Sequence, residues 1–291
     1  MLIGLIRSLR PRQWAKNVFV LAPLVFAQLV RDPVAVREAL LAFVAFCCAS
    51  SAVYLFNDLR DREEDRQHPL KRHRPIAAGV VSVPAASLTA VALVIVTLAI
   101  SANLGMAFTG YVLVYLLLNL LYSLGFKEFV ILDVMIVSLG FVLRVLGGGA
   151  AIGVEVSAWL LLCTILLALF LAFSKRRHEL ILLAEDASNH RPVLSHYSPL
   201  FLDQMINVVT ASTVVSYAIY AISPETVERF QTRYLVYTIP LVLFGIFRYL
   251  YLIYQKPTDE NPTEAILSDP PFLFNMGLWA AAVMWIVYNS A

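Results

Sequence analysis

The sequence predicts an all-α integral membrane protein with nine transmembrane helices. Three observations support this fold class. Of the 291 residues, 60% are hydrophobic and only 14% are charged, whereas soluble domains carry about 25% charged residues. The mean hydropathy is +0.76, so a soluble core of this composition would leave too little polar surface to face water. The apolar residues also form long continuous runs, without the alternation of period two that a membrane β-barrel requires.

Nine apolar segments are long enough to cross a bilayer, whose hydrocarbon core of about 30 Å takes roughly 20 helical residues. They are residues 15–30, 38–56, 83–102, 106–124, 130–152, 158–174, 204–222, 234–254 and 271–288. The first is the weakest, since polar residues precede its apolar stretch and Pro23 interrupts it. We expect a single transmembrane domain over residues 1–291, with polar loops at 57–82 and 175–203.

The distribution of Lys and Arg predicts the orientation in the membrane. If the nine segments alternate in direction, 16 of the 22 basic residues lie on the side of the N-terminus and 4 on the other. The positive-inside rule therefore places the N-terminus and both polar loops in the cytoplasm, for a protein of the inner or plasma membrane. The net charge of only +2 gives no reason to expect a nucleic-acid partner.

Three aspartates follow the second segment at a spacing that suits one helix face. If the helix continues beyond Asn57, then Asp58, Asp61 and Asp65 lie within about 60° of one another around its axis. Carboxylates at this spacing repel each other, so we expect a cation between them. Mg²⁺ prefers such oxygen ligands and takes one or two carboxylates together with water and phosphate oxygens. The alternative is a solvated helix end whose aspartates pair with the interleaved arginines.

A basic loop follows the aspartates, and its prolines prevent a continuous helix. It carries Lys71, Arg72 and Arg74. Cations beside carboxylates that hold Mg²⁺ provide what a diphosphate requires, a metal on one side and N–H donors on the other. The positive-inside rule alone would also place basic residues here, and this alternative stays open for each of them.

These segments resemble the UbiA superfamily of intramembrane prenyltransferases. The run Asn57-Asp58-x-x-Asp61-x-x-x-Asp65 after a membrane span is similar to the first aspartate-rich motif of that superfamily. Further segments resemble its decaprenyl-phosphate phosphoribosyltransferase branch, namely Arg10-Pro11-Arg12-Gln13-Trp14-x-Lys16-Asn17, His68-Pro69, Lys71-Arg72 and Arg74-Pro75-Ile76-Ala77-Ala78-Gly79. The resemblance covers nearly the whole chain. It implies helices around a central cavity that opens to the cytoplasm and laterally to the bilayer.

The fourth segment ends in a polar run that also resembles this branch. Asn119, Tyr122 and Ser123 share one helix face, Lys127 follows, and Asp133 begins the fifth segment. The resemblance implies that these residues line the cavity. The alternative for Tyr122 and Lys127 is the ordinary placement of such side chains at a membrane interface.

Arg144 lies within the fifth segment. A charge at membrane depth costs at least about 2.5–3.5 kcal/mol on insertion scales, so it usually faces a cavity or a partner. We expect Arg144 either to hold a phosphate or to pair with Asp133.

The second polar loop departs from the pattern of many UbiA relatives, which have an Asp-x-x-x-Asp motif there. This sequence has Lys175 and Glu179 in a Lys-Arg-Arg-x-Glu run, which resembles the phosphoribosyltransferase branch. The departure argues against a two-metal site for a prenyl diphosphate and favours a cationic site for a different phosphate.

The resemblance implies a Mg²⁺-dependent transferase that moves 5-phosphoribose from 5-phosphoribosyl 1-diphosphate to a polyprenyl phosphate and releases diphosphate. Such a reaction belongs to the pathway to lipid-linked arabinose donors of the cell wall. In this hypothesis the metal ligands are Asp58, Asp61 and Asp65, and the catalytic residues are Asp58, Asp61, Lys71 and Arg144. The expected substrate-binding residues are Lys16, Asn17, Asn57, Arg72, Arg74, Asn119, Tyr122, Lys127, Lys175 and Glu179.

Two other classes of function stay open at this point. One is a UbiA-type aromatic prenyltransferase that uses a prenyl diphosphate, for which the second aspartate motif is the discriminating feature. The other is a lipid or solute transporter, which predicts inverted repeats or paired broken helices that the sequence does not clearly show. A homo-oligomer is compatible with each of these hypotheses.

Overall fold

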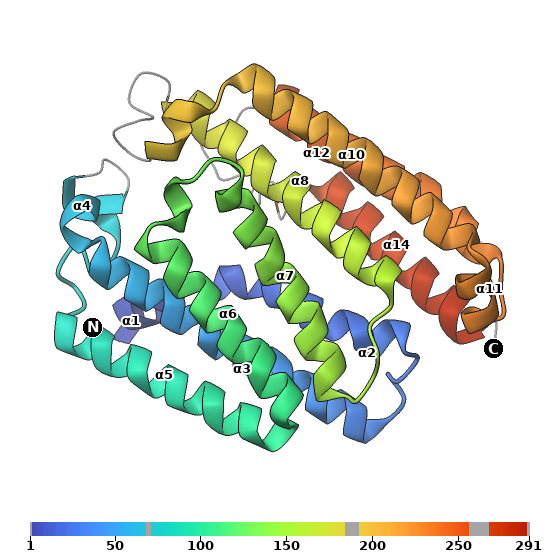
Figure 1. Cartoon of the computed structure of the whole chain (residues 1–291), viewed down its shortest axis with the longest axis horizontal. Coiled ribbons are helices and arrows are strands. Elements are labelled where there is room, and N and C mark those ends of the chain that lie inside the picture. Colours follow the sequence, from blue (N-terminus) through green and yellow to red (C-terminus); the bar gives the residue numbers. More distant parts are fainter. Residues whose placement is uncertain (1, 68–70, 184–191, 256–267, 290–291) are drawn as a thin grey trace. The chain divides into compact units, whose positions relative to one another are not determined.

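The structure is a computed structural model that describes residues 2–67, 71–183, 192–255 and 268–289 (Figure 1). Every regular element in these ranges is a helix. The chain forms two compact units. Unit 1 consists of Met1–Lys127 and Leu139–Val156, and unit 2 consists of Glu128–Ser138 and Ser157–Ala291.

Eight helices in the described ranges are long and apolar enough to cross a membrane. They are α3 (Pro33–Arg60), α5 (Val83–Leu104), α6 (Met106–Leu124), α7 (Leu132–Ala151), α8 (Ala158–Leu183), α10 (Pro199–Ile222), α12 (Ile239–Gln255, which continues the 3-10 helix η6 at Tyr234–Thr238) and α14 (Pro270–Asn289). The prediction of an all-helical membrane protein is confirmed, with eight such helices in place of the nine expected. Helix α7 contributes its first residues to unit 2 and the rest to unit 1.

The difference lies in the first predicted segment, residues 15–30, which is not one long α-helix. After α1 (Leu2–Leu9), the chain forms the 3-10 helix η1 (Pro11–Leu21) and the short helix α2 (Ala22–Phe26). A 3-10 helix of this length is uncommon, because its hydrogen bonds have poorer geometry than those of an α-helix. Here side-chain hydrogen bonds to α3 support it. Trp14 Nε1 donates to Ser51 Oγ at 3.0 Å, and Asn17 Nδ2 donates to Ser50 Oγ at 3.2 Å.

Helix α3 is the central element of unit 1, and α5 and α6 lie alongside it (Figure 1). Small residues of α3 are buried against its neighbours, which lets the backbones approach closely in the absence of a strong hydrophobic driving force. They include Ala42, Ala45 and Ala49. The ring of Phe46 packs edge-to-face against those of Phe108 and Tyr115 on α6. The polar end of α3 therefore lies at the same end of unit 1 as the end of α6 and the beginning of α5.

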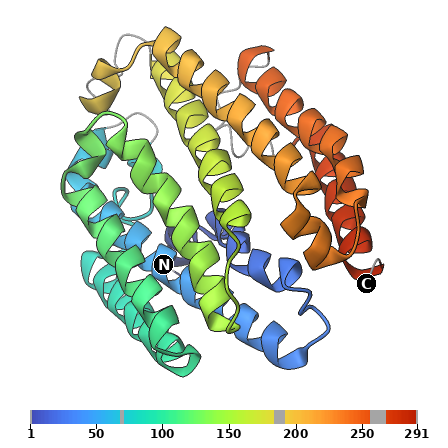
Figure 2. The ribbon, with the colours of Figure 1, turned by 45° about the vertical axis from the view of Figure 1, so that its right-hand side comes forward.

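Unit 2 is an antiparallel bundle of α8, α10, α12 and α14 (Figure 2). Its core contains Phe170, Phe173, Leu202, Ile206 and Tyr249. Arg177 near the end of α8 pairs with Asp203 at the beginning of α10, and Tyr254 near the end of α12 donates to the same carboxylate. These contacts place the polar ends of three helices together at one end of this unit.

We expect Gly148 to be essential for packing in unit 1. A Cβ atom at this position of α7 would overlap the backbone carbonyl of Val20, whose position η1 and α2 determine. Gly148→Ala should therefore destabilise the protein by about 3 kcal/mol, the upper part of the usual range for overpacking. The measurement is the thermal unfolding midpoint of the purified protein in detergent.

Gly110→Ala in α6 is the matched control, since a Cβ atom there meets nothing within 4 Å. Its midpoint should stay the same or rise, because alanine favours a helix over glycine by roughly 1 kcal/mol. Equal midpoints for the two variants would contradict the close approach of Val20 and Gly148.

Candidate active site

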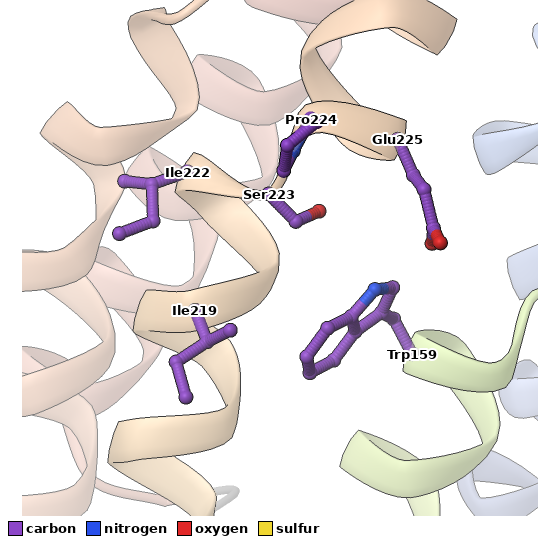
Figure 3. Close-up of a pocket in the computed structure, with 6 residues that line it drawn as sticks. All are labelled: Trp159, Ile219, Ile222, Ser223, Pro224 and Glu225. Carbon is purple, nitrogen blue, oxygen red and sulfur yellow. The ribbon is translucent and has the colours of Figure 1, made fainter.

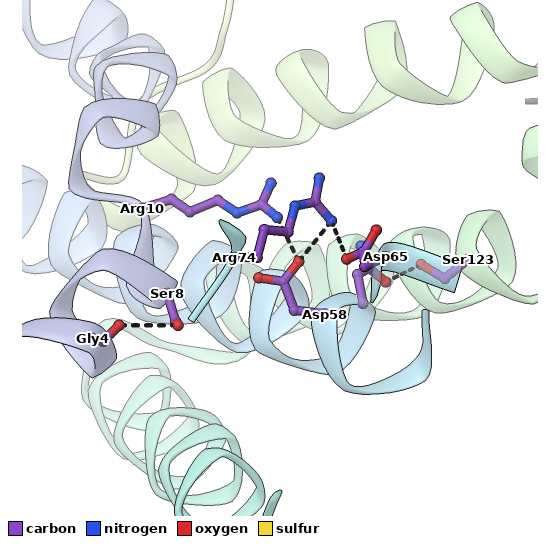
Figure 4. Close-up of polar contacts among 8 residues, drawn as sticks. Gly4, Ser8, Arg10, Asp58, Asp65, Arg74 and Ser123 are labelled. Carbon is purple, nitrogen blue, oxygen red and sulfur yellow. Dashed lines mark hydrogen bonds and ion pairs between the residues drawn. The ribbon is translucent and has the colours of Figure 1, made fainter. Parts of the chain in front are cut away.

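Two buried aspartates of unit 1 converge on one arginine (Figure 4). Asp58 and Asp65 are each only 2% exposed. Arg74 Nη1 donates to Asp58 Oδ1 at 3.0 Å and to Asp65 Oδ2 at 2.7 Å. Arg10 Nη2 donates to Asp58 Oδ1 at 2.6 Å. Burying a carboxylate requires such charged partners, because removal from water strongly disfavours the ionised form.

The three aspartates do not lie on one continuous helix, so the prediction of a single stripe is wrong. Helix α3 ends at Arg60, Asp61 adopts a non-helical backbone with φ −86° and ψ 13°, and α4 (Arg62–Gln67) begins after it. Asp61 therefore lies at the turn between these two helices. Its Oδ1 atom lies 3.8 Å from Lys127 Nζ instead. Within the described ranges, no three His, Cys, Asp or Glu side chains gather closely enough to hold a metal ion by themselves.

Arg10 is a further residue of this site, beyond those that the sequence motifs predicted. Its backbone is left-handed, with φ 54°, a conformation that costs a non-glycine residue roughly 1–2 kcal/mol. Its guanidinium stacks 4.8 Å from the centre of the Tyr54 ring while it binds Asp58. A signal was present in the sequence, because one face of α3 carries polar residues at offsets of 3, 4, 7 and 11. These are Cys47, Ser50, Ser51, Tyr54 and Asp58.

The end of α3 is also tied to the end of α6. Ser123 Oγ donates to Asn57 Oδ1 at 2.5 Å, and Arg60 donates to the backbone carbonyl of Ser123. Ser123 Oγ also lies 2.9 Å from the carbonyl oxygen of Asn119, one turn earlier. The structure therefore brings Asn57 and the polar face of α6 together, with Tyr122 half-buried beside them.

The residues of the basic loop differ in how deeply they are buried. Arg74 turns inward to the aspartates, Lys71 is half-buried and Arg72 is exposed. Ile76 is fully buried in a cluster with Leu55 of α3, which anchors the loop to the helix end. His68 and Pro69, part of the resemblance noted above, lie outside the described residues.

Arg144 does not pair with Asp133, so that part of the prediction is wrong. Its Nε donates to Asn17 Oδ1 at 2.7 Å, its Nη1 to the carbonyl of Gly140 at 2.7 Å and its Nη2 to Tyr115 Oη at 2.9 Å. Arg144 is 6% exposed, and its guanidinium also lies 4.8 Å from the centre of the Tyr115 ring. Lys16, beside the buried Asn17, is half-buried. The charge of Arg144 is thus stabilised by neutral oxygen atoms and an aromatic face.

Asp133 belongs to a second polar cluster, within unit 2. Arg176 Nε donates to Asp133 Oδ2 at 2.5 Å, and Arg176 Nη1 donates to Glu179 Oε2 at 2.9 Å. Lys175 Nζ lies 3.6 Å from Glu179 Oε1. Tyr197 Oη donates to Asp133 Oδ1 at 2.8 Å and accepts from the backbone N–H of Ile131 at 2.7 Å.

Burial raises the pKa of Tyr197, and the neighbouring Asp133 carboxylate raises this pKa further. The hydroxyl therefore keeps its proton and remains a donor to Asp133. Neither Tyr197 nor the role of Arg176 was predicted, because these contacts join residues 43 and 64 positions apart in the chain.

The predicted site residues thus lie in two groups, one in each unit. Unit 1 contains Lys16, Asn17, Asn57, Asp58, Asp61, Asp65, Lys71, Arg72, Arg74, Asn119, Tyr122, Lys127 and Arg144. Unit 2 contains Lys175 and Glu179. A separate pocket of about 480 Å³ in unit 2 is lined by Trp159, Ile219, Ile222, Ser223, Pro224 and Glu225 (Figure 3). None of the predicted site residues lines it.

The chemistry of the Asp58–Asp65 pair fits Mg²⁺. Both carboxylates reach a single nitrogen atom of Arg74, so they converge on one cation. Carboxylate oxygens are hard ligands, and Mg²⁺ typically takes one or two of them and completes its octahedron with water and phosphate oxygens. The arrangement therefore defines a multi-pass membrane protein with a buried acidic and basic site at the end of its helices.

Comparison with known proteins identifies the family. The model of the UbiA prenyltransferase family matches residues 18–287, and the chain belongs to this family. A relative from Corynebacterium glutamicum, named decaprenyl-phosphate phosphoribosyltransferase, is 37% identical over 98% of this chain and 87% of its own. A protein of the same name from Mycolicibacterium smegmatis is 36% identical over 99% of this chain and 93% of its own.

Solved structures agree with the fold. A UbiA homologue from Archaeoglobus fulgidus bound to GPP and Mg²⁺ matches with a TM-score of 0.74 at 21% identity, over 98% of this chain and 99% of that chain. The apo structure of a UbiA homologue from Aeropyrum pernix K1 matches with a TM-score of 0.68 at 18% identity, over 92% and 98% of the two chains. At these identities the likeness shows the fold alone.

Arg74→Ala should destabilise the protein by about 3–5 kcal/mol, because it removes the cation that two buried carboxylates share. Arg72→Ala is the matched control, since Arg72 is an exposed arginine of the same loop that donates to the neighbouring exposed His73 at 3.4 Å, and such a surface contact contributes at most about 1 kcal/mol. Thermal unfolding in detergent measures both variants. Similar losses of stability for the two would contradict the bridging role of Arg74.

Proposed function

We propose that this protein transfers 5-phosphoribose from 5-phosphoribosyl 1-diphosphate to a polyprenyl phosphate, with release of diphosphate. Two relatives whose name describes this activity are 36% and 37% identical over nearly the full length of the chain. The structural observation that carries the proposal is the convergence of Asp58, Asp65, Arg74 and Arg10 at the end of α3. A set of this kind suits a diphosphate bound with a divalent cation.

In the proposed reaction, an oxygen of the acceptor phosphate attacks C1 of the ribose. The bond between C1 and the diphosphate oxygen breaks, and the diphosphate leaves with the electron pair. The acceptor phosphate is already an anion at neutral pH, so no strong general base is required. The task of the protein is then to orient two anions toward each other and to stabilise the leaving diphosphate.

Asp58 and Asp65 would hold Mg²⁺, with Asp61 as a further carboxylate at the same helix end. When bound, this ion supplies positive charge to the leaving diphosphate. With a divalent cation held by Asp58 and Asp65, Arg10 and Arg74 would no longer be needed to balance these carboxylates and would donate to phosphate oxygens. Lys71 and Arg72 of the same loop extend this set of donors.

The remaining predicted residues serve the acceptor phosphate or the 5-phosphate in this proposal. Lys16 and Lys127 carry the charges, and Asn57, Asn119 and Tyr122 form the neutral polar surface next to them. We assign Arg144 to positioning rather than to phosphate binding, because its hydrogen bond to Asn17 holds η1 against α7. Asn17 in turn holds η1 against α3.

We further propose that the N-terminal segment completes a ninth crossing of the bilayer. It runs antiparallel to α3, from the contact of Trp14 with Ser51 to the packing of Leu24 against Ala35. At 1.5 Å per residue, this stretch of α3 is about 24 Å long, most of the roughly 30 Å hydrocarbon core. The cavity between such crossings would open to the cytoplasm and laterally to the bilayer, where the lipid acceptor resides.

The orientation proposed for the protein has its N-terminus and active site in the cytoplasm. The 16 basic residues on the side of the N-terminus, against 4 on the other, support this orientation. A cytoplasmic site also suits a soluble, highly charged sugar diphosphate as donor.

The decisive experiment incubates the purified protein in detergent with a polyprenyl phosphate, Mg²⁺ and labelled 5-phosphoribosyl 1-diphosphate. We expect a labelled lipid whose formation requires the divalent cation and stops with EDTA. A parallel reaction offers a prenyl diphosphate and an aromatic acid. Turnover in the second reaction without a labelled lipid in the first would establish an aromatic prenyltransferase and overturn the proposal.

Asp58→Asn and Asp61→Asn should each lower the rate of transfer by about 100-fold or more, because each removes a negative charge from the proposed metal site. Glu64→Gln is the matched control, an exposed carboxylate next to Asp65. It should leave the rate unchanged. Unfolding midpoints of all three variants test whether the protein still folds, and retained activity in both aspartate variants would remove the metal from the mechanism.

A further inference from the structure

Arg176 is held between two carboxylates inside unit 2. Its side chain is 3% exposed, and that of Asp133 is fully buried. The guanidinium uses two neighbouring nitrogen atoms for two different acids, Nε for Asp133 at 2.5 Å and Nη1 for Glu179 at 2.9 Å. Two carboxylates from different helices therefore bond to different edges of one guanidinium, which lies between them.

As in the Asp58–Arg74–Asp65 contact, one arginine binds two carboxylates, but here it uses two nitrogen atoms and is held more firmly. Arg74 is about one-third exposed and lies on a loop, whereas Arg176 is buried and lies within α8. Tyr197 adds a further hydrogen bond to Asp133, which orients the carboxylate toward Arg176. If Arg176 moved away from these carboxylates, its buried charge would lose its partners, at a cost of several kcal/mol.

Glu179 connects the buried Arg176 to the more exposed Lys175. One of its oxygens accepts from Arg176, and the other lies 3.6 Å from Lys175 Nζ. The side chain of Lys175 is 38% exposed. Arg176 therefore fixes Glu179, and Glu179 restrains an accessible ammonium group.

We propose that Arg176 is a permanent counter-ion for Asp133 and Glu179, so that this carboxylate pair binds no divalent cation and instead positions Lys175 for a phosphate group. The proposal deepens the function proposed above and rests on it for the identity of the phosphate, a phosphate group of the substrates. In the part of the chain that the structure describes, the divalent cation then binds at Asp58 and Asp65. Arg176 and Glu179 are positioning residues, and Lys175 contacts the anion.

The number of Mn²⁺ ions bound per chain gives the number of metal sites directly. We titrate Mn²⁺ into the purified protein in detergent and measure the free ion by electron paramagnetic resonance, which needs no turnover. The wild type should bind one Mn²⁺ per chain, and the double variant Asp58→Asn/Asp65→Asn should bind none. Arg176→Gln should bind a second Mn²⁺, because it leaves Asp133 and Glu179 without the cation that they share, and adding Glu179→Gln to it should remove that second ion.

Arg177→Gln is the matched control. Arg177 is the next residue of α8, and its Nε bonds to Asp203 while its guanidinium stacks on Tyr254. This variant should still bind one Mn²⁺. Mn²⁺ should raise the unfolding midpoint of Arg176→Gln more than that of the wild type or of Arg177→Gln.

Glu179→Gln alone keeps the proposal testable if Arg176→Gln does not fold, since Glu179 is partly exposed and outside the deepest part of the cluster. It should bind one Mn²⁺, like the wild type. A wild type that binds two ions and loses one in Glu179→Gln would overturn the proposal. An Arg176→Gln protein that folds, binds one ion and gains no stability from Mn²⁺ would overturn it as well.

The anion is tested with inorganic phosphate in the presence of EDTA. Phosphate should raise the unfolding midpoint of the wild type, and this rise should be smaller in Lys175→Ala and in Glu179→Gln. An equal rise in all three proteins would remove the anion role of Lys175. Because these measurements use neither donor nor acceptor lipid, they stand even if the transfer assay fails.

Discussion

The sharing of Arg74 by Asp58 and Asp65 is the contact on which one end of unit 1 depends. Two carboxylates at the end of a membrane helix would repel each other and lose their hydration if they were buried alone. The guanidinium that both share comes from a loop that must fold back to provide it, and Arg10 adds a second one to Asp58. The position of that loop, the restart of the chain in α4 and the approach of Arg10 all follow from this requirement.

The same requirement is met differently at the other buried cations. Arg144 is surrounded by an amide oxygen, a backbone carbonyl and a phenol. Within the described residues, no acidic side chain forms an ion pair with it. Arg176 is cancelled by two carboxylates. An uncancelled buried charge is more strongly tied to its neutral ligands, which suits Arg144 to hold η1 in place. In the other cluster, Arg176 and Lys175 together balance Asp133 and Glu179, so these four side chains carry no net charge.

Much of the fold could be predicted from the sequence, because lipid imposes a simple rule on composition. Apolar runs near 20 residues long correspond to the eight long helices α3, α5, α6, α7, α8, α10, α12 and α14, in which backbone hydrogen bonding decides the structure. The first segment does not follow this rule, since its conformation depends on side-chain contacts of Trp14 and Asn17 with α3. The aspartate and arginine residues near Asp58 were visible as a local motif. The turn at Asp61 and the partners of Asp133 were not, because residues far along the chain determine them.

The 3-10 helix η1 also restricts how the sequence can vary in length. Arg10, Trp14 and Asn17 meet Asp58, Ser51 and Ser50 in order along α3. Side chains three residues apart are eclipsed in a 3-10 helix, so inserting or deleting one residue rotates everything after it by about 120°. One such change would misplace the contacts on one side of it, whatever residue was added. Residues 10–21 should therefore tolerate substitutions at exposed positions such as Arg12 and Val18 but no change in length.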